Sequence, residues 1–279
     1  MNTLRTIVLM GFLTALIVAV GGVMGGRFGV LVAFVFAVLI NFGSYWFSDK
    51  LALAMAHAQP VEPSQAPELY EIVQQLSEKA QIPRPAVYIT PSASPNAFAT
   101  GRDPEHSAIA VTQGILSILN TSELSAVLAH ELAHVANRDV LITSIASVMA
   151  SVVTMIAHFG MYGGRGEGDD RPNPVFALVL MIAAPIAASL INLAISRSRE
   201  FEADRTGAQI CGHPEALASA LAKLEEGTQI RPMTGVNPAM GNMFTVRPDV
   251  GNWFVNLMST HPPIEERIKR LLSMPRHDL

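Results

Sequence analysis

His130 and His134, with Glu131 beside the first of them, could together hold a metal ion and activate a water molecule. Two histidines four residues apart lie on one face of a helix, about one turn from each other, so both imidazoles can reach one ion. All three ionisable side chains stand in the otherwise apolar window 124–136, where buried charges are costly unless something binds them. The same pattern also occurs by chance in amphipathic helices with partly exposed polar residues, so the surrounding sequence must decide.

A helix is predicted to carry these residues, within the run from Asn120 to Asp139. Asn120 followed three residues later by Glu123 is typical of a helix N-cap with its capping partner. No proline or glycine interrupts the run. Apolar residues recur through it at helical spacing, at Leu124, Val127, Leu128, Leu132 and Val135.

The composition indicates a membrane protein. Half of the 279 residues are hydrophobic, only 15% are charged, and the mean hydropathy is +0.34. A net charge of -4 without a basic cluster gives no sign of a nucleic-acid partner. Cys211 is the only cysteine, so the chain can form no internal disulfide and no cysteine cluster for a metal.

Four apolar runs have about the ~20 residues that a helix needs to cross a bilayer. They are 6–26, 28–48, 140–160 and 177–195. The first pair predicts a retained transmembrane hairpin in residues 1–48 rather than a cleaved signal peptide. The second pair predicts another hairpin in 140–196, with a buried hydrophobic hairpin of a soluble core as the alternative.

Residues 49–139 and 197–279 are expected to form the two parts of a protease domain. In the first part, 68–80 is predicted to be an amphipathic helix, and 86–90 and 107–112 are predicted strands joined by the connection 91–101. A strand just before the metal-binding helix suggests a sheet edge where a peptide could pair through its backbone. A purely structural sheet explains the same pattern equally well.

A third metal ligand is needed, because two histidines seldom hold a catalytic zinc. Glu200 and Asp204 are four residues apart and share a helix face, while Glu202 points elsewhere. At ~1.5 Å per residue, His134 and Glu200 lie at similar heights beside the third and fourth apolar runs. Glu200 is therefore the predicted ligand, and Asp204 could accept the second ring N–H of His130. A solvated helix start, paired with neighbouring arginines, is the alternative.

Three motifs in this order resemble those of the HtpX-type membrane metalloproteases, relatives of the CAAX prenyl endopeptidases. The motifs are HELAHVANRD at 130–139, SRSREFEADRTGA at 196–208 and THPPIEERIKRL at 260–271. The resemblance covers nearly the whole chain and includes PNAFATG at 95–101. It implies a mainly α-helical integral membrane protein with about four transmembrane helices and a cytoplasmic zincin-like α+β domain of the gluzincin type.

The resemblance also implies roles for individual residues. His130, His134 and Glu200 would bind one Zn²⁺ ion, and Glu131 would be the general base. His261 would donate a hydrogen bond in the transition state, with helix capping or packing as the alternative. Asn96 would contact the substrate backbone, although an asparagine in a proline-flanked turn has an ordinary structural explanation.

The expected substrates are unfolded polypeptides or segments of misfolded membrane proteins, and the expected location is the bacterial inner membrane. Lysines and arginines fall mostly on one side of the four-span arrangement, which predicts that the active site faces the cytoplasm. A prenyl-protein endopeptidase is the near alternative. A non-catalytic membrane scaffold and a transporter are the alternatives from other classes. The intact site residues His130, Glu131, His134 and Glu200 argue against a scaffold. The spans hold few polar residues, which argues against a transporter.

Overall fold

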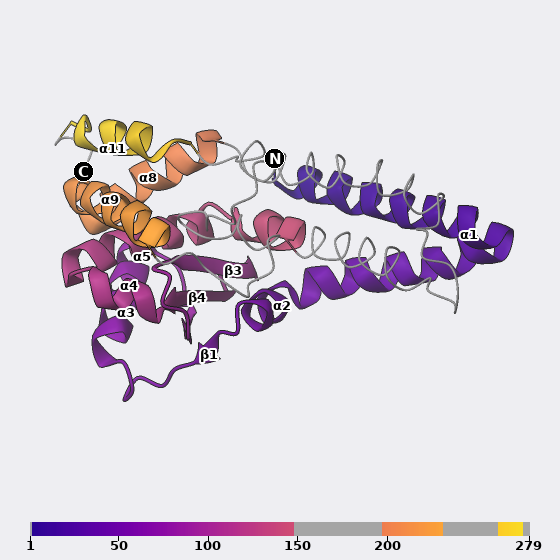
Figure 1. The fold of residues 1–279 in the computed structure, drawn as a ribbon, viewed down its shortest axis with the longest axis horizontal. Helices are drawn as coiled ribbons and strands as arrows, with labels where there is room; N and C mark the ends of the chain where they lie inside the picture. The colour runs from indigo at the N-terminus through magenta and orange to yellow at the C-terminus, as the bar shows by residue number, and fades with distance from the viewer. Residues whose placement is uncertain (1, 148–196, 231–261, 276–279) are drawn as a thin grey trace.

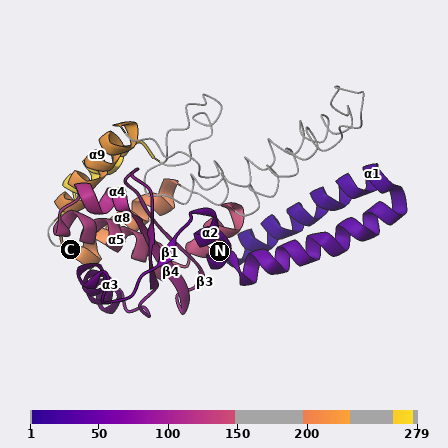
Figure 2. The same cartoon turned by 60° about the horizontal axis from the view of Figure 1, so that its bottom comes forward.

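The computed structural model describes residues 2–147, 197–230 and 262–275. A small sheet and the helices packed on it form one body, from which a long helical hairpin projects (Figure 1). Figure 2 shows the same separation of hairpin and body after a 60° turn. The predicted span 177–195, most of the predicted span 140–160 and His261 lie outside the described residues. Residues 140–147, which begin the third apolar run, are helical.

The N-terminal segment turns back on itself as a hairpin. α1 runs over Asn2–Trp46, but non-helical backbone angles at Gly25 and Gly26 divide it into two arms. Gly26 has a φ of 54°, a conformation that glycine adopts readily and other residues rarely do. The second arm, Gly25–Trp46, is long and apolar enough to cross a membrane, whereas the apolar part of the first arm, Thr6–Gly22, is shorter.

The two arms are joined by polar and apolar contacts. The Asn41 side-chain amide donates to the Thr14 hydroxyl at 2.7 Å and to the Met10 carbonyl at 3.2 Å. Leu13, Ile17 and Ala37 are buried in one cluster with Ile142, Ile145 and Ala146, so the hairpin packs on helix 140–147. The outer face exposes many large hydrophobic side chains, as a helix in lipid does. They include Phe28, Leu31, Phe34, Leu39 and Phe42.

A four-stranded mixed sheet has the strand order β1-β2-β4-β3. Its strands are β1 (Gln59–Pro60), β2 (Ala86–Thr90), β3 (Ala97–Asp103) and β4 (His106–Thr112). β2 and β4 are parallel, and β3 pairs with β4 in the antiparallel direction. The predicted strands 86–90 and 107–112 are confirmed as β2 and β4.

The prediction that 91–101 is only a connection was wrong, because its second half belongs to β3. Ala97 and Ala99 are weak strand formers, so their pairing with Val111 and Ile109 depends on tertiary context that local sequence does not show. β4, which α4 (Gln113–Ile118) separates from the metal-binding helix, therefore lies inside the sheet. Among the described strands, β3 is the edge beside that helix.

The helices enclose one main core against the sheet. They are α2 (Ser48–Met55), α3 (Pro67–Lys79), α4 (Gln113–Ile118), α5 (Thr121–Ala136), α8 (Arg197–Cys211), α9 (Pro214–Ile230) and α11 (Ile264–Leu272). The predicted helix 68–80 is confirmed as α3, and the metal-binding helix as α5. Leu128 and Leu132 of α5 are fully buried, which turns the opposite side of α5 toward α8.

Candidate metal centre

The start of α5 is fixed by the capping box that the sequence predicts. The Asn120 side chain accepts from the Glu123 backbone N–H at 2.9 Å, and the Glu123 carboxylate accepts from the Asn120 N–H at 3.0 Å. Two of the orphan N–H donors at the helix N-terminus are therefore satisfied. This cap sets where the helix begins and hence which face His130 and His134 occupy, about three and four turns later.

The end of α5 brings a further carboxylate to the site. Arg138 adopts the left-handed conformation (φ 56°), its N–H donates to the Val135 carbonyl at 3.0 Å, and the Asp139 N–H donates to the His134 carbonyl at 2.9 Å. This pair of bonds is a Schellman motif, formed here with arginine at the position that usually holds glycine. The turn returns Asp139 to His134, with Asp139 Oδ2 3.6 Å from Nδ1 of the ring. Asp139 has no role predicted from the sequence.

Helix α8 approaches α5 closely because residue 207 is a glycine. A Cβ atom at Gly207 would lie 2.8 Å from both the Cα and the backbone N of His130. No side chain fits there, so the two helix backbones nearly touch beside the first histidine. This contact places the α8 carboxylates over α5. Gly207 is thus a positioning residue, and in the sequence it stands out only as part of a longer motif.

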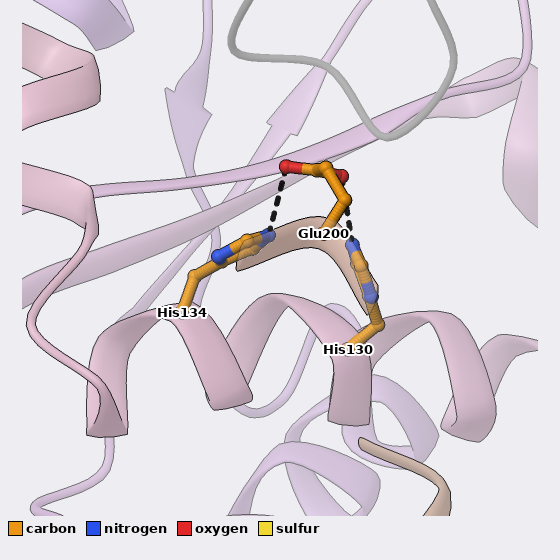
Figure 3. Close-up of side chains that lie close together, drawn as sticks. All are labelled: His130, His134 and Glu200. Atoms are coloured by element: carbon orange, nitrogen blue, oxygen red, sulfur yellow. Dashed lines mark ion pairs between the residues drawn. The ribbon is translucent and has the colours of Figure 1, made fainter. Parts of the chain in front are cut away.

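His130, His134 and Glu200 converge as predicted (Figure 3). Each offers one ligand atom, and these atoms lie within 4.8 Å of one another. Glu200 Oε1 lies 3.6 Å from His134 Nε2, and Glu200 Oε2 lies 3.9 Å from His130 Nε2. Donor atoms about 2.0 to 2.2 Å from one tetrahedral ion are about 3.3 to 3.6 Å apart, so small shifts of these side chains would let the cluster hold a metal ion.

Asp204 holds His130 in the form that can bind an ion. Its Oδ1 lies 3.0 Å from Nδ1 of the ring. Because a carboxylate only accepts hydrogen bonds, Nδ1 carries the hydrogen and Nε2 remains available as the ligand atom. The sequence predicted this contact, and the structure places both residues where it requires them.

Arg267 of α11 completes this chain of contacts and was missed in the sequence. It donates two hydrogen bonds to Asp204, at 2.8 Å from Nε and 2.6 Å from Nη2, and Nη2 also lies 3.4 Å from His130 Nε2. Burial alone would raise the pKa of Asp204, but the Arg267 charge outweighs it and lowers that pKa to about 2. A recognisable signal existed, because Arg267 lies on the apolar stripe of its helix, three residues after Ile264 and four before Leu271.

His134 lies among several carboxylates. Burial alone would lower the pKa of His134, but the contact with Asp139 and the charge of Glu200 outweigh it and raise that pKa to about 9. Arg199 Nη1 lies 3.6 Å from Asp139 Oδ1 and offsets part of this negative charge. The histidine ring is thus oriented from both sides, by Asp139 at Nδ1 and Glu200 at Nε2.

Glu131 is held against the edge strand of the sheet. Its side chain is buried, and Oε2 accepts a hydrogen bond from the Ala99 backbone N–H of β3 at 3.0 Å. Ala99 also packs with Val135 and Val140, the residues at the end of α5 and just beyond. The carboxylate therefore has a fixed place beside the cluster, between the metal-binding helix and β3.

Asn96 is fully buried just before β3. Its Oδ1 accepts from the Ala97 N–H at 3.1 Å, and its own N–H donates to the Thr112 hydroxyl at 2.8 Å. These bonds give Asn96 a structural role in the entry to β3. Its predicted contact with substrate, like the predicted role of His261, remains a prediction.

The fold and the site define a metallopeptidase, in which two histidines of one helix and a glutamate of a later helix converge beside a buried glutamate. Residues 63–275 match the model of peptidase family M48. Protease HtpX homologs are 51% identical to this chain in Syntrophotalea carbinolica, covering 98% of this chain and 99% of that protein, and 52% identical in Syntrophobacter fumaroxidans, covering 97% and 98%. The chain belongs to peptidase family M48 and is a metalloendopeptidase.

One solved structure has a similar fold. The crystal structure of S. mikatae Ste24p has a TM-score of 0.53 and 17% sequence identity with this chain. The match covers 97% of this chain and 65% of that one. At this identity the likeness shows the fold alone.

Proposed function

We propose that this metalloendopeptidase uses zinc to hydrolyse peptide bonds in unfolded or membrane-anchored polypeptides, as part of protein quality control at the inner membrane. The observation that carries the proposal is the position of Glu131. Its buried carboxylate lies beside the His130, His134 and Glu200 cluster and is fixed by the Ala99 N–H. A scaffold with an inactive protease fold has no use for a buried base in addition to three converging ligands.

Zinc is proposed because two imidazoles and one carboxylate are the donor set of many catalytic zinc sites. Bound there, zinc would polarise the substrate carbonyl and acidify a water molecule. Cobalt and manganese ions also bind to such ligands. Analysis of the metal in the purified protein would therefore show which of the three ions it holds.

The protein side chains divide the remaining work. Glu131 takes a proton from the attacking water and afterwards passes it to the departing amine. The Ala99 N–H donates to one carboxylate oxygen of Glu131 and so fixes how the carboxylate is oriented. Asp204 and Arg267 keep the His130 ring in one tautomer and orientation, and Asp139 does the same for His134.

Membrane embedding is proposed from the apolar N-terminal hairpin and from the third and fourth apolar runs of the sequence. The arm Gly25–Trp46 has the length and composition of a span, and its large hydrophobic side chains are exposed. The four apolar runs of the sequence support four spans, and the distribution of lysine and arginine around these spans supports a cytoplasmic active site. The partners of the protein are then the bilayer and its polypeptide substrates.

The test is cleavage of casein by detergent-purified enzyme with zinc restored, with bound metal measured in each variant. Glu131→Gln should abolish cleavage and keep the metal, while Glu200→Gln should lose both. Glu202→Gln is the matched control, because Glu202 is on the same helix, exposed and paired with Arg205 at 3.1 Å. Equal cleavage by wild type and Glu131→Gln would refute the assignment of the base.

A prenyl-protein endopeptidase is the second candidate, because the HtpX-type proteases that the sequence motifs resemble are relatives of the CAAX prenyl endopeptidases. The two functions differ in what the substrate must carry. If casein is untouched and a C-terminal peptide is cleaved only when it is prenylated, the second candidate replaces the first.

A further inference from the structure

We propose that Arg199 is a positioning residue that acts through Asp139 on the metal ligand His134. Asp139 directly precedes the apolar run 140–160, and Arg199 follows the run 177–195. The link therefore also makes metal binding depend on the bilayer around these two runs. The inference rests on the proposed function, since it concerns the zinc ligands and the proposed spans.

The two metal-binding histidines have the same kind of support. The first has the buried Asp204 carboxylate at its Nδ1, and Arg267 pairs with that carboxylate. Behind His134, Asp139 Oδ2 lies 3.6 Å from Nδ1, and Arg199 Nη1 lies 3.6 Å from Asp139 Oδ1. Each ring thus has a carboxylate at Nδ1 and an arginine on that carboxylate. At 3.6 Å the second set is made of ion-pair contacts rather than close hydrogen bonds, so small movements alter it.

The Asp139–Arg199 pair is largely shielded from water. Asp139 is 5% exposed, and the Arg199 side chain is 15% exposed. Removing one partner of such a pair leaves the other charge in a poorly solvated place, unlike the loss of a pair on the open surface. Loss of Arg199 should therefore move or reorient the Asp139 carboxylate.

Asp139 is the joint between the metal-binding helix and the helix that begins the third apolar run. Its N–H donates to the His134 carbonyl at 2.9 Å, in the turn that ends α5. Its own carbonyl accepts from the Thr143 N–H at 3.3 Å, in the first turn of helix 140–147. One residue thus ends α5, begins the next helix and carries the carboxylate that contacts His134. A change of angle between the two helices moves that carboxylate.

Helix 140–147 is held mainly by the N-terminal hairpin. Its first residue, Val140, packs with Val135 at the end of α5. Further along, it is buried in one cluster with both arms of α1, a cluster formed by Ile142, Ile145, Ala146, Leu13, Ile17 and Ala37. The helix therefore follows the hairpin, and with it the bilayer in which we propose that the hairpin lies.

Arg199 brings the other end of the two apolar runs to the same point. It lies in the first turn of α8, next to the third ligand Glu200. Its contact with Asp139 joins the residue before the third run to a residue just after the fourth. A movement of one run relative to the other therefore changes this contact.

Bilayer thickness is the property that this link would report. The run 140–160 is about 31 Å long as a helix, at ~1.5 Å per residue, which is close to the thickness of a hydrocarbon core. Such a helix tilts more in a thinner bilayer. Because the tilt turns about Asp139, it should change how well His134 fits the ion and hence the affinity for zinc.

The first experiment is a double-mutant cycle on zinc affinity. Full-length protein in lipid nanodiscs is titrated against a zinc chelator as wild type, Arg199→Gln, Asp139→Asn and the double variant. Each single change should weaken binding by about tenfold or more, as loss of a group that orients a ligand typically does. If Arg199 acts through Asp139, the double variant binds no more weakly than Asp139→Asn alone. Losses that multiply, or an affinity that Arg199→Gln leaves unchanged or raises, would overturn the proposal.

The absorption spectrum of bound cobalt separates a positioning role from a purely structural one, because it depends on ligand geometry. Arg199→Gln should shift this spectrum, and Arg199→Lys should restore it in part. Arg197→Gln is the matched control, since Arg197 is exposed on the same turn of α8. A lower temperature of unfolding in Arg199→Gln with an unchanged cobalt spectrum would overturn the proposal.

The second experiment varies the bilayer. Zinc affinity is measured in nanodiscs of dimyristoleoyl and of dierucoyl phosphatidylcholine, whose bilayers differ in thickness. The wild type should differ by about threefold or more between the two lipids, and most of this difference should disappear in Asp139→Asn. Equal wild-type affinities in the two lipids would overturn the link to the bilayer. Zinc-loaded wild type that fails to cut casein would instead refute the proposed function, whatever the affinities show.

Discussion

Arg267 and Asp204 form a buried, two-bond ion pair between residues 63 positions apart in the chain. Arg267 is 1% exposed and Asp204 is 4% exposed. The pair joins α11 to α8, and the same Asp204 carboxylate also contacts Nδ1 of His130. The ligand geometry of α5 thus depends on a C-terminal helix that contributes no ligand of its own.

Arg267→Gln should weaken both the fold and the metal site. It leaves the Asp204 carboxylate buried without its cation, which typically costs about 3 to 5 kcal/mol of the free energy of unfolding. Loss of a group that orients a metal ligand typically lowers metal affinity by about 10- to 100-fold. Thermal unfolding of the detergent-solubilised protein and a competition titration with a zinc chelator measure the two effects.

Two other substitutions in α11 sharpen this test. Arg267→Lys keeps the charge but cannot make both hydrogen bonds, so its effects should be intermediate. Arg270→Gln is the matched control, because Arg270 is largely exposed, where it pairs with Glu266 at 2.7 Å and stacks on the Phe201 ring, 3.6 Å from its centroid. It should cost about 1 kcal/mol, less than loss of the buried pair. Equal losses in Arg270→Gln and Arg267→Gln would contradict the role given to the buried pair.

Gly207→Ala should separate α8 from α5 and disable the site. The added methyl group would lie 2.8 Å from backbone atoms of His130, so one helix must move. Overpacking of this kind typically costs about 1 to 3 kcal/mol. Because Asp204 and Glu200 move with α8, bound zinc and casein cleavage should both fall at least tenfold. The control is Gly43→Ala, where a Cβ would meet nothing within 4 Å. Full metal content in Gly207→Ala would refute this account.

The features that the sequence predicted are those with local signals. Spacing of four residues put His130 and His134 on one helix face, and Asn120 with Glu123 marked where that helix begins. Glu200 could be predicted because it follows the fourth apolar run at about the distance by which His134 precedes the third. If those two runs are antiparallel helices, the two residues lie at the same height. Each of these inferences needed only neighbouring residues and the rise of a helix.

The features that the sequence did not predict depend on contacts between distant segments. β3 consists partly of alanines and becomes a strand by pairing with β4. Asp139 reaches His134 through a Schellman turn with arginine in place of the usual glycine. Arg267 looks like one of several charges in a polar helix until Asp204 is placed beside it. An arginine on the apolar stripe of a helix is the one local clue that could have marked it.

Glu123 should contribute stability that is lost in acid. Its carboxylate, at the N-terminus of α5, accepts from Lys223 at 2.8 Å and from Ser219 at 2.7 Å, both on α9. Burial alone would raise the pKa of Glu123, but the hydrogen bonds from Lys223, the Asn120 backbone and Ser219 outweigh it and lower that pKa below 4.5. Folding therefore favours the ionised form. The contribution is complete above pH 4.5 and is lost as the pH falls from there through the lower pKa of the folded state.

Glu123→Gln should accordingly destabilise the protein at pH 7, by about 1 to 3 kcal/mol for hydrogen bonds to a charged group. The difference from wild type should shrink as the pH falls below 4.5, because the wild-type carboxyl then becomes neutral as well. Thermal unfolding of both proteins between pH 7 and pH 3 measures this difference. The comparison cancels the pH dependence of all other ionisable groups, because both proteins share them. Glu266→Gln, at an exposed pair on α11, is the control and should change stability by less than about 0.5 kcal/mol. A Glu123→Gln deficit that stays constant down to pH 3 would mean that packing of the side chain, rather than its charge, joins α5 to α9.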